Sequence, residues 1–263
     1  MKTTSLLILA FCFLLGSCNS QAKKIESQAP ATEVKVESPK TIQFPSLDSL
    51  IITAHLYQID DTSPFILLCH QARFNKFEYA GIAEKLNEMG FNCMAIDQRS
   101  GGPIGNKQNE TYLKALTKGK DFQYLDAEPD LRAAIQYASK HFGPKIILWG
   151  SSYSSTLALY LAAEMDEVQA VISFSPGNYF AEQKGSLVDV LEKFEKPMFL
   201  TSSKSEAKYV KALLEKHKLS KMQTQFIPNG AGHHGSRALW INQQGGEEYW
   251  VAINKFLNQI KDN

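Results

Sequence analysis

From about residue 41 onward, short apolar runs alternate with segments whose apolar residues recur every three or four positions. Runs such as PFILLCH, FNCMAID and KIILWG are almost wholly apolar, which predicts strands that are buried on both faces of a sheet. Segments such as FEYAGIAEKLNEMG have helical spacing, and Gly90 at the end of this segment is a favourable helix C-cap. The alternation predicts an α/β domain with a mostly parallel, mixed sheet of about eight strands and helices on both faces.

Three further patterns refine the expected architecture. TIQFPSL and LIITAHLYQI alternate apolar and polar residues around a break at Asp48-Ser49, which predicts an antiparallel pair at the start of the sheet. DAEPDLRAAIQYASKHFG predicts a helix with Asp126 as its N-cap and Pro129 in its first turn. The polar, glycine-rich stretch 100–123 is too long for a simple connection, so we expect a loop that borders a binding site.

The N-terminal part of the chain differs in composition from the rest. A basic residue precedes an apolar run that is too short to span a membrane and is typical of a signal peptide, here residues 1–17. The run ends in LLGSC, which resembles a bacterial lipobox and implies a lipid on Cys18. Such a lipid would anchor the chain to a membrane of the bacterial cell envelope, on its periplasmic or surface face. Plain secretion after cleavage near Cys18 is the alternative. Residues 18–40 are polar and predict a flexible tether, so the folded domain is expected at 41–263.

The overall composition is that of an ordinary globular protein, with 44% hydrophobic and 21% charged residues. The 28 Lys and Arg residues nearly balance the 27 Asp and Glu residues, and no basic patch or zinc-type cysteine spacing is visible. Nucleic acid is therefore not an expected partner. Cys69 and Cys93 fall in two apolar runs that predict neighbouring strands. We expect two buried thiols, although export from the cell would permit a disulfide.

Polar residues suited to nucleophilic catalysis follow four of the predicted strands. Ser152 lies in the turn after KIILW, Glu206 lies beyond PMFLT, His233 and His234 follow MQTQFIP, and His70 follows PFILLC. Ligands of open α/β sheets bind at the carboxyl ends of the strands, so these residues are expected at one edge. A serine hydroxyl needs a base to take its proton, histidine is suited to that task, and a carboxylate stabilises the imidazolium that forms.

Spacing singles out Ser152 among the serines of KIILWGSSYSSTLALYLAA. Where a strand turns sharply into a helix around a nucleophile, the backbones approach closely, and small residues are needed two before and two after it. Ser152 has Gly150 and Ser154 at these positions, whereas Ser151 would have bulky aromatic residues there. The alternative is a serine-rich helix N-cap without a catalytic role.

From about residue 64 to the end, the chain resembles the α/β-hydrolase superfamily, and within it the small dienelactone-hydrolase-like group of esterases and lipases. The resemblance rests on ILLCHQARFNKFEYAGIAEKLNEMGFNCMAIDQRSGG, GSSYSSTLAL, AVISFSPG and GAGHHGS, and on the chain order serine, acid, histidine. It implies the α/β-hydrolase fold and a catalytic triad of Ser152, Glu206 and a histidine. The oxyanion hole is then expected from the backbone N–H groups of Tyr153 and Ala72, with Gln71 as a second choice to Ala72.

The chain departs from the superfamily pattern at three positions. Ser154 replaces the last glycine of the elbow, Gln71 replaces the glycine after His70, and Glu206 stands where aspartate is common. Serine is small enough to keep the elbow packed, whereas Gln71 can present its N–H only from an allowed backbone conformation. Glu206 could alternatively be a solvated residue in the first turn of a helix.

Five further residues need an assignment. GAGH favours His233 as the base and HGS favours His234, and we favour His234. We expect His70 to brace its loop rather than to take part in chemistry. Asp97 and Arg99, in DQRSGG, are expected to form an ion pair or to brace the loop that contains them.

These residues together predict a serine hydrolase that cleaves an ester or related acyl bond of a small molecule through an acyl-enzyme on Ser152. The motifs call for no metal and no organic cofactor. An acyltransferase or peptidase with the same triad, and a non-catalytic binding lipoprotein on this scaffold, are the alternatives. Stretches 100–123 and 177–193 are expected to shape the pocket, with an apolar or aromatic lining that includes Tyr112, Phe122, Tyr124, Tyr179 and Phe180.

Overall fold

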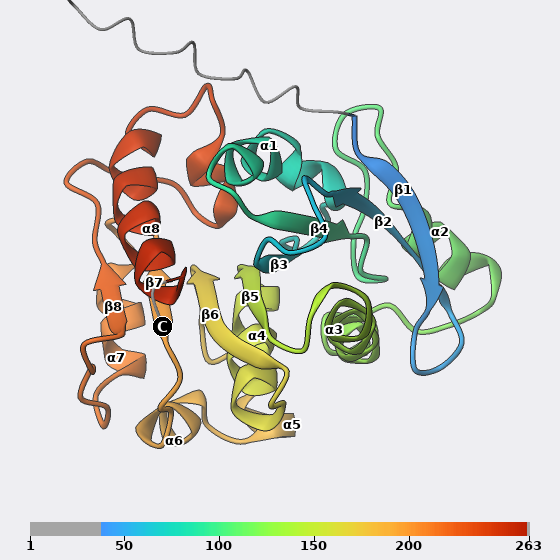
Figure 1. Cartoon of the computed structure of the whole chain (residues 1–263). Coiled ribbons are helices and arrows are strands. Elements are labelled where there is room, and N and C mark those ends of the chain that lie inside the picture. The colour runs from blue at the N-terminus through green and yellow to red at the C-terminus, as the bar shows by residue number, and fades with distance from the viewer. Residues whose placement is uncertain (1–37, 262–263) are drawn as a thin grey trace, which may run out of the picture. The chain divides into compact units, whose positions relative to one another are not determined.

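The computed structural model describes residues 38–261, which form one eight-stranded sheet with the strand order β1-β2-β4-β3-β5-β6-β7-β8. Strand β2 pairs antiparallel with both β1 and β4, and all other neighbours pair parallel (Figure 1). The mixed, mostly parallel sheet confirms the expected fold class. The strands are β1 (Lys40–Pro45), β2 (Ile51–Tyr57), β3 (Phe65–Cys69), β4 (Asn92–Ile96), β5 (Ile146–Ser151), β6 (Val168–Phe174), β7 (Met198–Thr201) and β8 (Gln223–Phe226).

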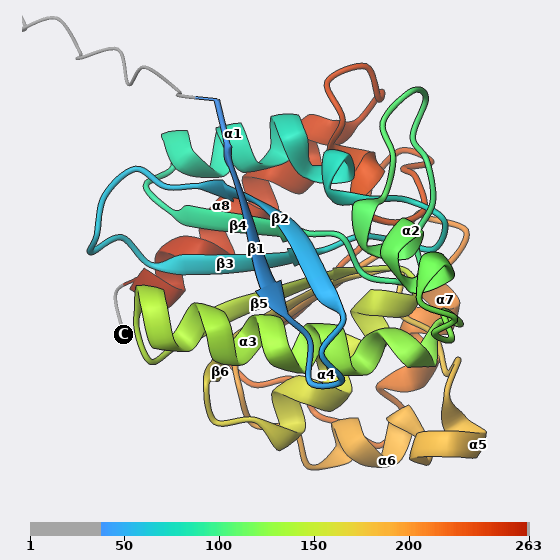
Figure 2. The same cartoon turned by 90° about the vertical axis from the view of Figure 1, so that its right-hand side faces the viewer.

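Helices cover both faces of this sheet. Helices α1 and α8 lie on one face, and α3, α4 and α6 lie on the other (Figure 2). The connections between neighbouring parallel strands run through helices, with α1 between β3 and β4, α4 between β5 and β6, α5 and α6 between β6 and β7, and α7 between β7 and β8. The helices are α1 (Ala80–Glu88), α2 (Glu110–Thr117), α3 (Glu128–Phe142), α4 (Tyr153–Glu164), α5 (Ala181–Lys184), α6 (Leu187–Glu192), α7 (Ala207–Leu213) and α8 (Gly246–Lys261), with short 3-10 helices η1 (Lys76–Tyr79), η2 (Leu125–Ala127) and η3 (Ser236–Leu239).

The sheet separates two apolar cores. Successive side chains of a strand point to opposite faces, so in β3 Phe65, Leu67 and Cys69 pack with α3 and α4, whereas Ile66 and Leu68 pack with α1 and α8. All five of these side chains are at most 1% exposed. Burial on both faces explains why these strands are apolar throughout rather than alternating.

Cys69 and Cys93 are both buried free thiols, as the sequence predicts. They lie on the neighbouring strands β3 and β4, where Cys93 pairs with Ile66 and Cys69 pairs with Ile96. The two thiols therefore belong to opposite faces of the sheet, Cys69 to one core and Cys93 to the other. This separation explains why adjacent strands bring no disulfide here.

The predicted antiparallel opening is confirmed, with β1 and β2 paired from Lys40–Leu56 to Pro45–Ile51. Ser49 turns the chain between them with a positive φ of 68°. The predicted signal peptide, the lipid-bearing Cys18 and nearly all of the predicted tether lie outside the described residues. Within 38–261, every helix is too short or too polar to cross a membrane.

Two local predictions are wrong. The stretch 100–123 is not a loop throughout, because it contains α2, whose N-cap Asn109 accepts a hydrogen bond from Tyr112 N–H. Asp126 is not the N-cap of α3, because its carboxylate instead accepts from Gln123 N–H at 2.6 Å in the preceding turn. A short polar side chain such as Asp126 can bond the backbone of either of two neighbouring turns, and the tertiary structure selects one.

Candidate active site

Ser152 lies at the sharp turn between β5 and α4, with φ 58° and ψ −124°. This strained left-handed conformation is uncommon for a residue other than glycine and is found where surrounding structure enforces it. Gly150 shows why the turn is tight, because a Cβ there would lie 2.5 Å from Ser155 Cα and closer still to Ser154 O. The first residues of α4 thus pack directly onto the end of β5, which leaves Ser152 at the apex.

Ser154, the serine in place of the usual glycine, is fully buried and uses its hydroxyl within the turn. Its Oγ donates to Cys69 O at 2.8 Å and accepts from Ser151 N–H at 2.9 Å. The substitution therefore leaves the packing intact and adds a bond between the elbow and the end of β3. A buried hydroxyl with both partners is a stabilising feature rather than a defect.

His234 lies between Ser152 and Glu206. Its Nε2 is 2.8 Å from Ser152 Oγ, and its Nδ1 is 2.5 Å from Glu206 Oε1. An ionised carboxylate can only accept, so Nδ1 carries the proton and Nε2 is free to accept from the serine hydroxyl. The three side chains come from the ends of β5, β7 and β8, and the arrangement is that of a nucleophile, a base and an orienting acid.

Glu206 is held in place by three donors. Besides His234, Ser175 Oγ donates to its Oε2 at 2.9 Å and Ser203 N–H donates at 3.2 Å. Burial by itself would raise the pKa of Glu206, but these hydrogen bonds and the charge of His234 outweigh it and lower the pKa to about 2. The carboxylate therefore stays ionised, and the interpretation of Glu206 as a merely solvated helix residue does not describe its surroundings.

Ser175 is a site residue that the sequence reasoning missed. It follows β6 with a positive φ of 57°, accepts from Gly235 N–H at 3.0 Å and donates to Glu206. It thus connects the acid to the loop that carries the base. Its position at the carboxyl end of a strand, within SFSPG, was the available signal.

His233 does not join this arrangement. Neither Ser152 nor Glu206 forms a hydrogen bond or ion pair with His233 among the contacts within 38–261. Gly235 follows with φ 70°, a conformation that turns the chain sharply directly after His234. The structure therefore places His234, and not its neighbour, against the serine.

The two predicted oxyanion donors, Tyr153 and Ala72, follow β5 and β3, which are neighbours in the sheet. Tyr153 N–H is at the first position of α4, where a helix has no internal acceptor for it. Gln71 N–H is already engaged, because it donates to Glu78 Oε2 at 2.7 Å. This leaves Ala72 as the candidate donor in the loop after β3, where the backbone of Arg73 adopts the positive φ of 63° that glycine would favour.

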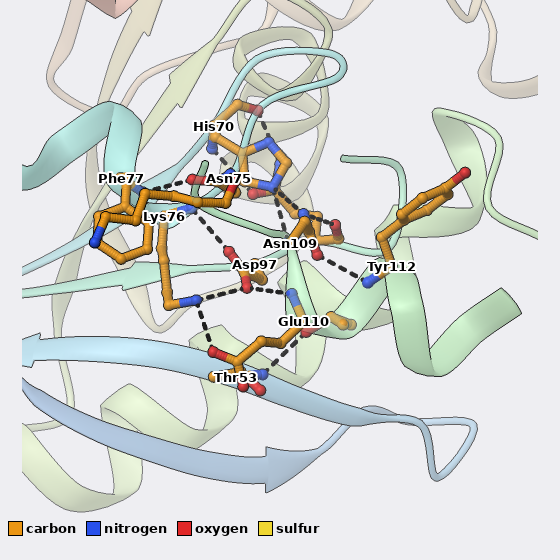
Figure 3. A network of polar contacts seen from close by, with 12 residues as sticks. Thr53, His70, Asn75, Lys76, Phe77, Asp97, Asn109, Glu110 and Tyr112 are labelled. Carbon is orange, nitrogen blue, oxygen red and sulfur yellow. Dashed lines mark hydrogen bonds and ion pairs between the residues drawn. The ribbon is translucent and has the colours of Figure 1, made fainter. Parts of the chain in front are cut away.

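A buried polar network supports the loop after β3 (Figure 3). His70 Nδ1 donates to Gln71 O at 2.8 Å, while its Nε2 accepts from Gln98 N–H at 3.0 Å and contacts the Asn109 side chain at 3.2 Å. Burial lowers the pKa of His70 to about 4, although its backbone hydrogen bonds oppose the shift. His70 is therefore a neutral brace of its loop, as expected.

Asp97 and Arg99 both form ion pairs, but not with each other. Asp97 pairs with the fully buried Lys76 at 2.9 Å and also accepts from Lys76 N–H and Glu110 N–H (Figure 3). Arg99 pairs with Asp130 at 2.7 Å and with Asp48 at 2.8 Å. Both residues fix the strand ends and loops beside the candidate site, which agrees with the structural role expected for them.

The aromatic residues expected around the pocket divide into three groups. Tyr179 is 51% exposed and lies close to Ser152 and Glu206. Tyr124 is 41% exposed and stacks on Tyr153 with ring centroids 4.9 Å apart. Phe180, by contrast, is buried in the same apolar core as the residues of α4. The remaining two residues of the expected lining contact one another, Tyr112 edge-to-face on Phe122.

Among the residues that the structure describes, no three His, Cys, Asp or Glu side chains lie close enough together to hold a metal ion. The polar groups near Ser152 are instead those of the hydrogen-bonded chain from Ser152 to Glu206.

Comparison with known structures identifies the fold. No protein-family model matches the sequence. The structure is similar to that of esterase Pf2001 from Pyrococcus furiosus, with a TM-score of 0.66 and 16% identity over 90% of this chain and 98% of that chain. It is also similar to a dienelactone hydrolase from Anabaena variabilis, with a TM-score of 0.61 and 17% identity over 85% and 99% of the two chains. The chain therefore has the α/β-hydrolase fold.

A sequence relative is the acyltransferase drtE from Aspergillus calidoustus, which is 20% identical over 231 residues. The match covers 84% of this chain but only 64% of the acyltransferase.

Proposed function

We propose that this chain is a serine hydrolase that cleaves an ester or related acyl bond through an acyl-enzyme on Ser152. The observation that carries the proposal is the continuous hydrogen-bonded chain from Ser152 through His234 to Glu206. Its location at the carboxyl ends of β5, β7 and β8, in a fold shared with an esterase and a dienelactone hydrolase, supports the same assignment.

The proposed reaction follows from the arrangement of these groups. Ser152 Oγ attacks the acyl carbon while His234 Nε2 takes its proton, and Glu206 stabilises the imidazolium that results. The negative charge on the substrate oxygen is held by the N–H groups of Tyr153 and Ala72. His234 then gives the proton to the departing alkoxide, which leaves an acyl-enzyme. A water molecule, deprotonated by His234, cleaves this ester and releases the acid and the free serine.

The substrate side of the site carries two tyrosines. Tyr179 and Tyr124 are partly exposed next to Ser152 and Tyr153, respectively. Their rings offer an apolar surface with a polar tip, which suits a small ester with an aromatic or alkyl group. A small-molecule acyl compound is therefore the proposed substrate class.

The test is hydrolysis of p-nitrophenyl esters of increasing acyl length, with labelling by a fluorophosphonate probe. We expect wild type to turn over short esters and to label once, and Ser152→Ala to do neither. Matched controls are Ser154→Ala and Ser155→Ala, which remove neighbouring hydroxyls of the same turn and leave Ser152 in place. Labelling that persists in Ser152→Ala would exclude Ser152 as the nucleophile. Absence of both labelling and turnover in wild type would favour a non-catalytic binding protein on this scaffold.

Acyl transfer is a second candidate, which the similarity to an acyltransferase favours. Hydrolysis and transfer share the acyl-enzyme and differ only in the group that attacks it. Product analysis with an added alcohol or amine separates them. A product ester or amide that exceeds the free acid at millimolar acceptor would identify transfer as the main reaction.

We further propose that Cys18 carries a lipid that anchors the mature chain to a membrane of the bacterial cell envelope. The apolar run that ends in LLGSC supports this proposal. Expression of the whole chain in a bacterium with labelled palmitate tests it. We expect the wild-type protein to be labelled and to be recovered in the membrane fraction. The Cys18→Ser variant should be unlabelled and should be recovered in the soluble fraction.

A further inference from the structure

Glu78 is a buried carboxylate beside the candidate active site that the proposed reaction does not use. It lies in η1, is 1% exposed, and its main-chain carbonyl accepts from Trp240 Nε1 at 2.8 Å. None of the ion pairs between residues 38 and 261 includes Glu78. A carboxylate without a cation is costly to bury unless its oxygens are hydrogen-bonded, so the contacts of Glu78 account for its presence there.

The two oxygens of Glu78 bind two different loops. Oε2 accepts from Gln71 N–H at 2.7 Å, and Oε1 accepts from Ser151 Oγ at 2.8 Å. Gln71 directly precedes Ala72, the predicted oxyanion donor, and Ser151 directly precedes the nucleophile. A single carboxylate thus bonds to the residue before each of these two groups, although Glu78 and Ser151 are separated by 73 positions in the chain.

A third loop joins through Ser151. Its Oγ accepts from Ser236 N–H at 2.8 Å, and Ser236 lies two residues after His234. Gly235 packs closely against Ser151 and the Gln71 side chain, since a Cβ there would lie 2.6 Å from Ser151 Oγ and 3.0 Å from Gln71 Oε1. The loops that carry the donor, the nucleophile and the base therefore all meet at the Glu78 carboxylate and the Ser151 hydroxyl.

We propose that Glu78 is a positioning residue, which fixes the Ala72 donor relative to Ser152 and His234 without contacting the substrate. The inference rests on the serine hydrolase function proposed above. Because Gln71 N–H is bound to the carboxylate, the peptide between His70 and Gln71 keeps one orientation. The next peptide carries Ala72 N–H and is held through Gln71 O, which accepts from His70 Nδ1 at 2.8 Å. Donors that are fixed in advance stabilise a transition state far better than donors that must be reoriented.

Two substitutions separate the geometry from the charge. Glu78→Ala leaves Gln71 N–H and the Ser151 hydroxyl without their acceptor. Glu78→Gln keeps an amide oxygen for Gln71, but its NH₂ group then faces Ser151 Oγ, and the serine proton loses its acceptor. Loss of one oxyanion donor lowers kcat by about 10²–10³-fold in enzymes of this kind. We expect a loss of about 10²-fold or more in Glu78→Ala and a smaller loss in Glu78→Gln, with KM changed less than about threefold in both.

The experiment measures kcat and KM for a p-nitrophenyl ester. The kcat value is calculated per active site, with the concentration of sites taken from the extent of fluorophosphonate labelling at completion. It also measures the affinity of an alkyl trifluoromethyl ketone, which forms a tetrahedral adduct on serine. We expect this affinity to fall by the same factor as kcat, because adduct and transition state need the same donor. Glu84→Gln, an exposed glutamate six residues along the same segment, is the matched control and is expected to behave as wild type.

The result that overturns the inference is an active wild type whose Glu78 variants keep kcat per labelled site, and ketone affinity, within threefold of the wild-type values. A lower melting temperature alone would then assign Glu78 a purely structural role. If Glu78→Ala fails to fold, the inference can still be tested with Glu78→Gln, because glutamine preserves the side-chain size and one of the hydrogen bonds. A wild type that neither labels at Ser152 nor cleaves esters overturns the proposed function itself, and this inference with it.

Discussion

Replacing Glu206 with glutamine removes a charge from the candidate triad while preserving side-chain size. Glu206 Oε1 lies 2.5 Å from His234 Nδ1, and Ser175 and Ser203 hold the other oxygen. In the proposed reaction, His234 gains a positive charge as it takes the proton of Ser152. The negative charge of Glu206 therefore stabilises the transition state more than the ground state, and its loss should appear in kcat.

The size of the effect follows from the geometry of the pair. Both side chains are about one third exposed, 33% for His234 and 31% for Glu206, so an effective dielectric constant of about 20 is appropriate. Two unit charges about 4 Å apart then attract by about 4 kcal/mol, which corresponds to about 10³-fold in rate. A glutamine can also donate to Nδ1 and force the imidazole proton onto Nε2, where it blocks acceptance from Ser152. We expect kcat to fall by about 10³–10⁴-fold, with KM nearly unchanged.

The assay is steady-state hydrolysis of p-nitrophenyl acetate by wild type, Glu206→Gln and Glu215→Gln. Glu215 is an exposed glutamate just beyond the end of α7, so its variant controls for the loss of a negative charge from this region. The Glu215 variant is expected to match wild type. A folded Glu206→Gln protein that retains more than about a tenth of wild-type kcat would refute the assignment of Glu206 as the acid.

Three other predictions test separate parts of the structure. Gly150→Ala drives a methyl group into the backbone of Ser154, so we expect a loss of about 1–3 kcal/mol in urea unfolding and little remaining esterase activity; unchanged stability would contradict the close packing of the turn. His234→Ala should abolish ester hydrolysis and His233→Ala should preserve it, and the reverse result would transfer the role of base to His233. Burial raises the pKa of Glu78 to about 7 from 4.5, so between these pH values the folded chain holds a proton that the unfolded chain has released, whereas above about pH 7 Glu78 is ionised in both states. That contribution to stability is lost as the pH rises from about 4.5 to 7, and Glu78→Gln should remove the loss. In urea unfolding, the variant should gain up to about 3 kcal/mol relative to wild type over this range, and a constant difference would argue against the shift.

Chain periodicity was sufficient to predict the sheet and most helices. The apolar runs of β3, β4 and β5 are buried on both faces, and the helical spacing of α1 and α8 reflects one face packed on the sheet. These signals are local, because a side chain's direction relative to its neighbours follows from the backbone period alone. The elbow could be located for the same reason, since the small residues that it needs lie two positions from Ser152.

Contacts between residues on distant loops could not be predicted from the sequence. His233 and His234 are adjacent, and nothing local decides which side chain turns toward a serine 82 positions away. Ser175 and Glu78 lie in quoted motifs, but their contacts come from partners in distant segments, at separations of 31 and 73 positions. Lys76, which patterning would place at the surface, is buried because Asp97 lies at the end of the next strand.

The amino-acid sequence thus determined the order along the chain of the strands and of most helices, and the identity of the nucleophile candidate, since these depend on spacing along a few consecutive residues. Glu206 as the candidate acid followed from the resemblance to the α/β-hydrolase superfamily. The tertiary structure decided which histidine meets Ser152 and which loop N–H groups are already bonded. It also decided how a buried carboxylate joins the three loops of the site. These features depend on the direction of side chains that approach from distant segments, and that direction is fixed only when the sheet brings the strand ends together.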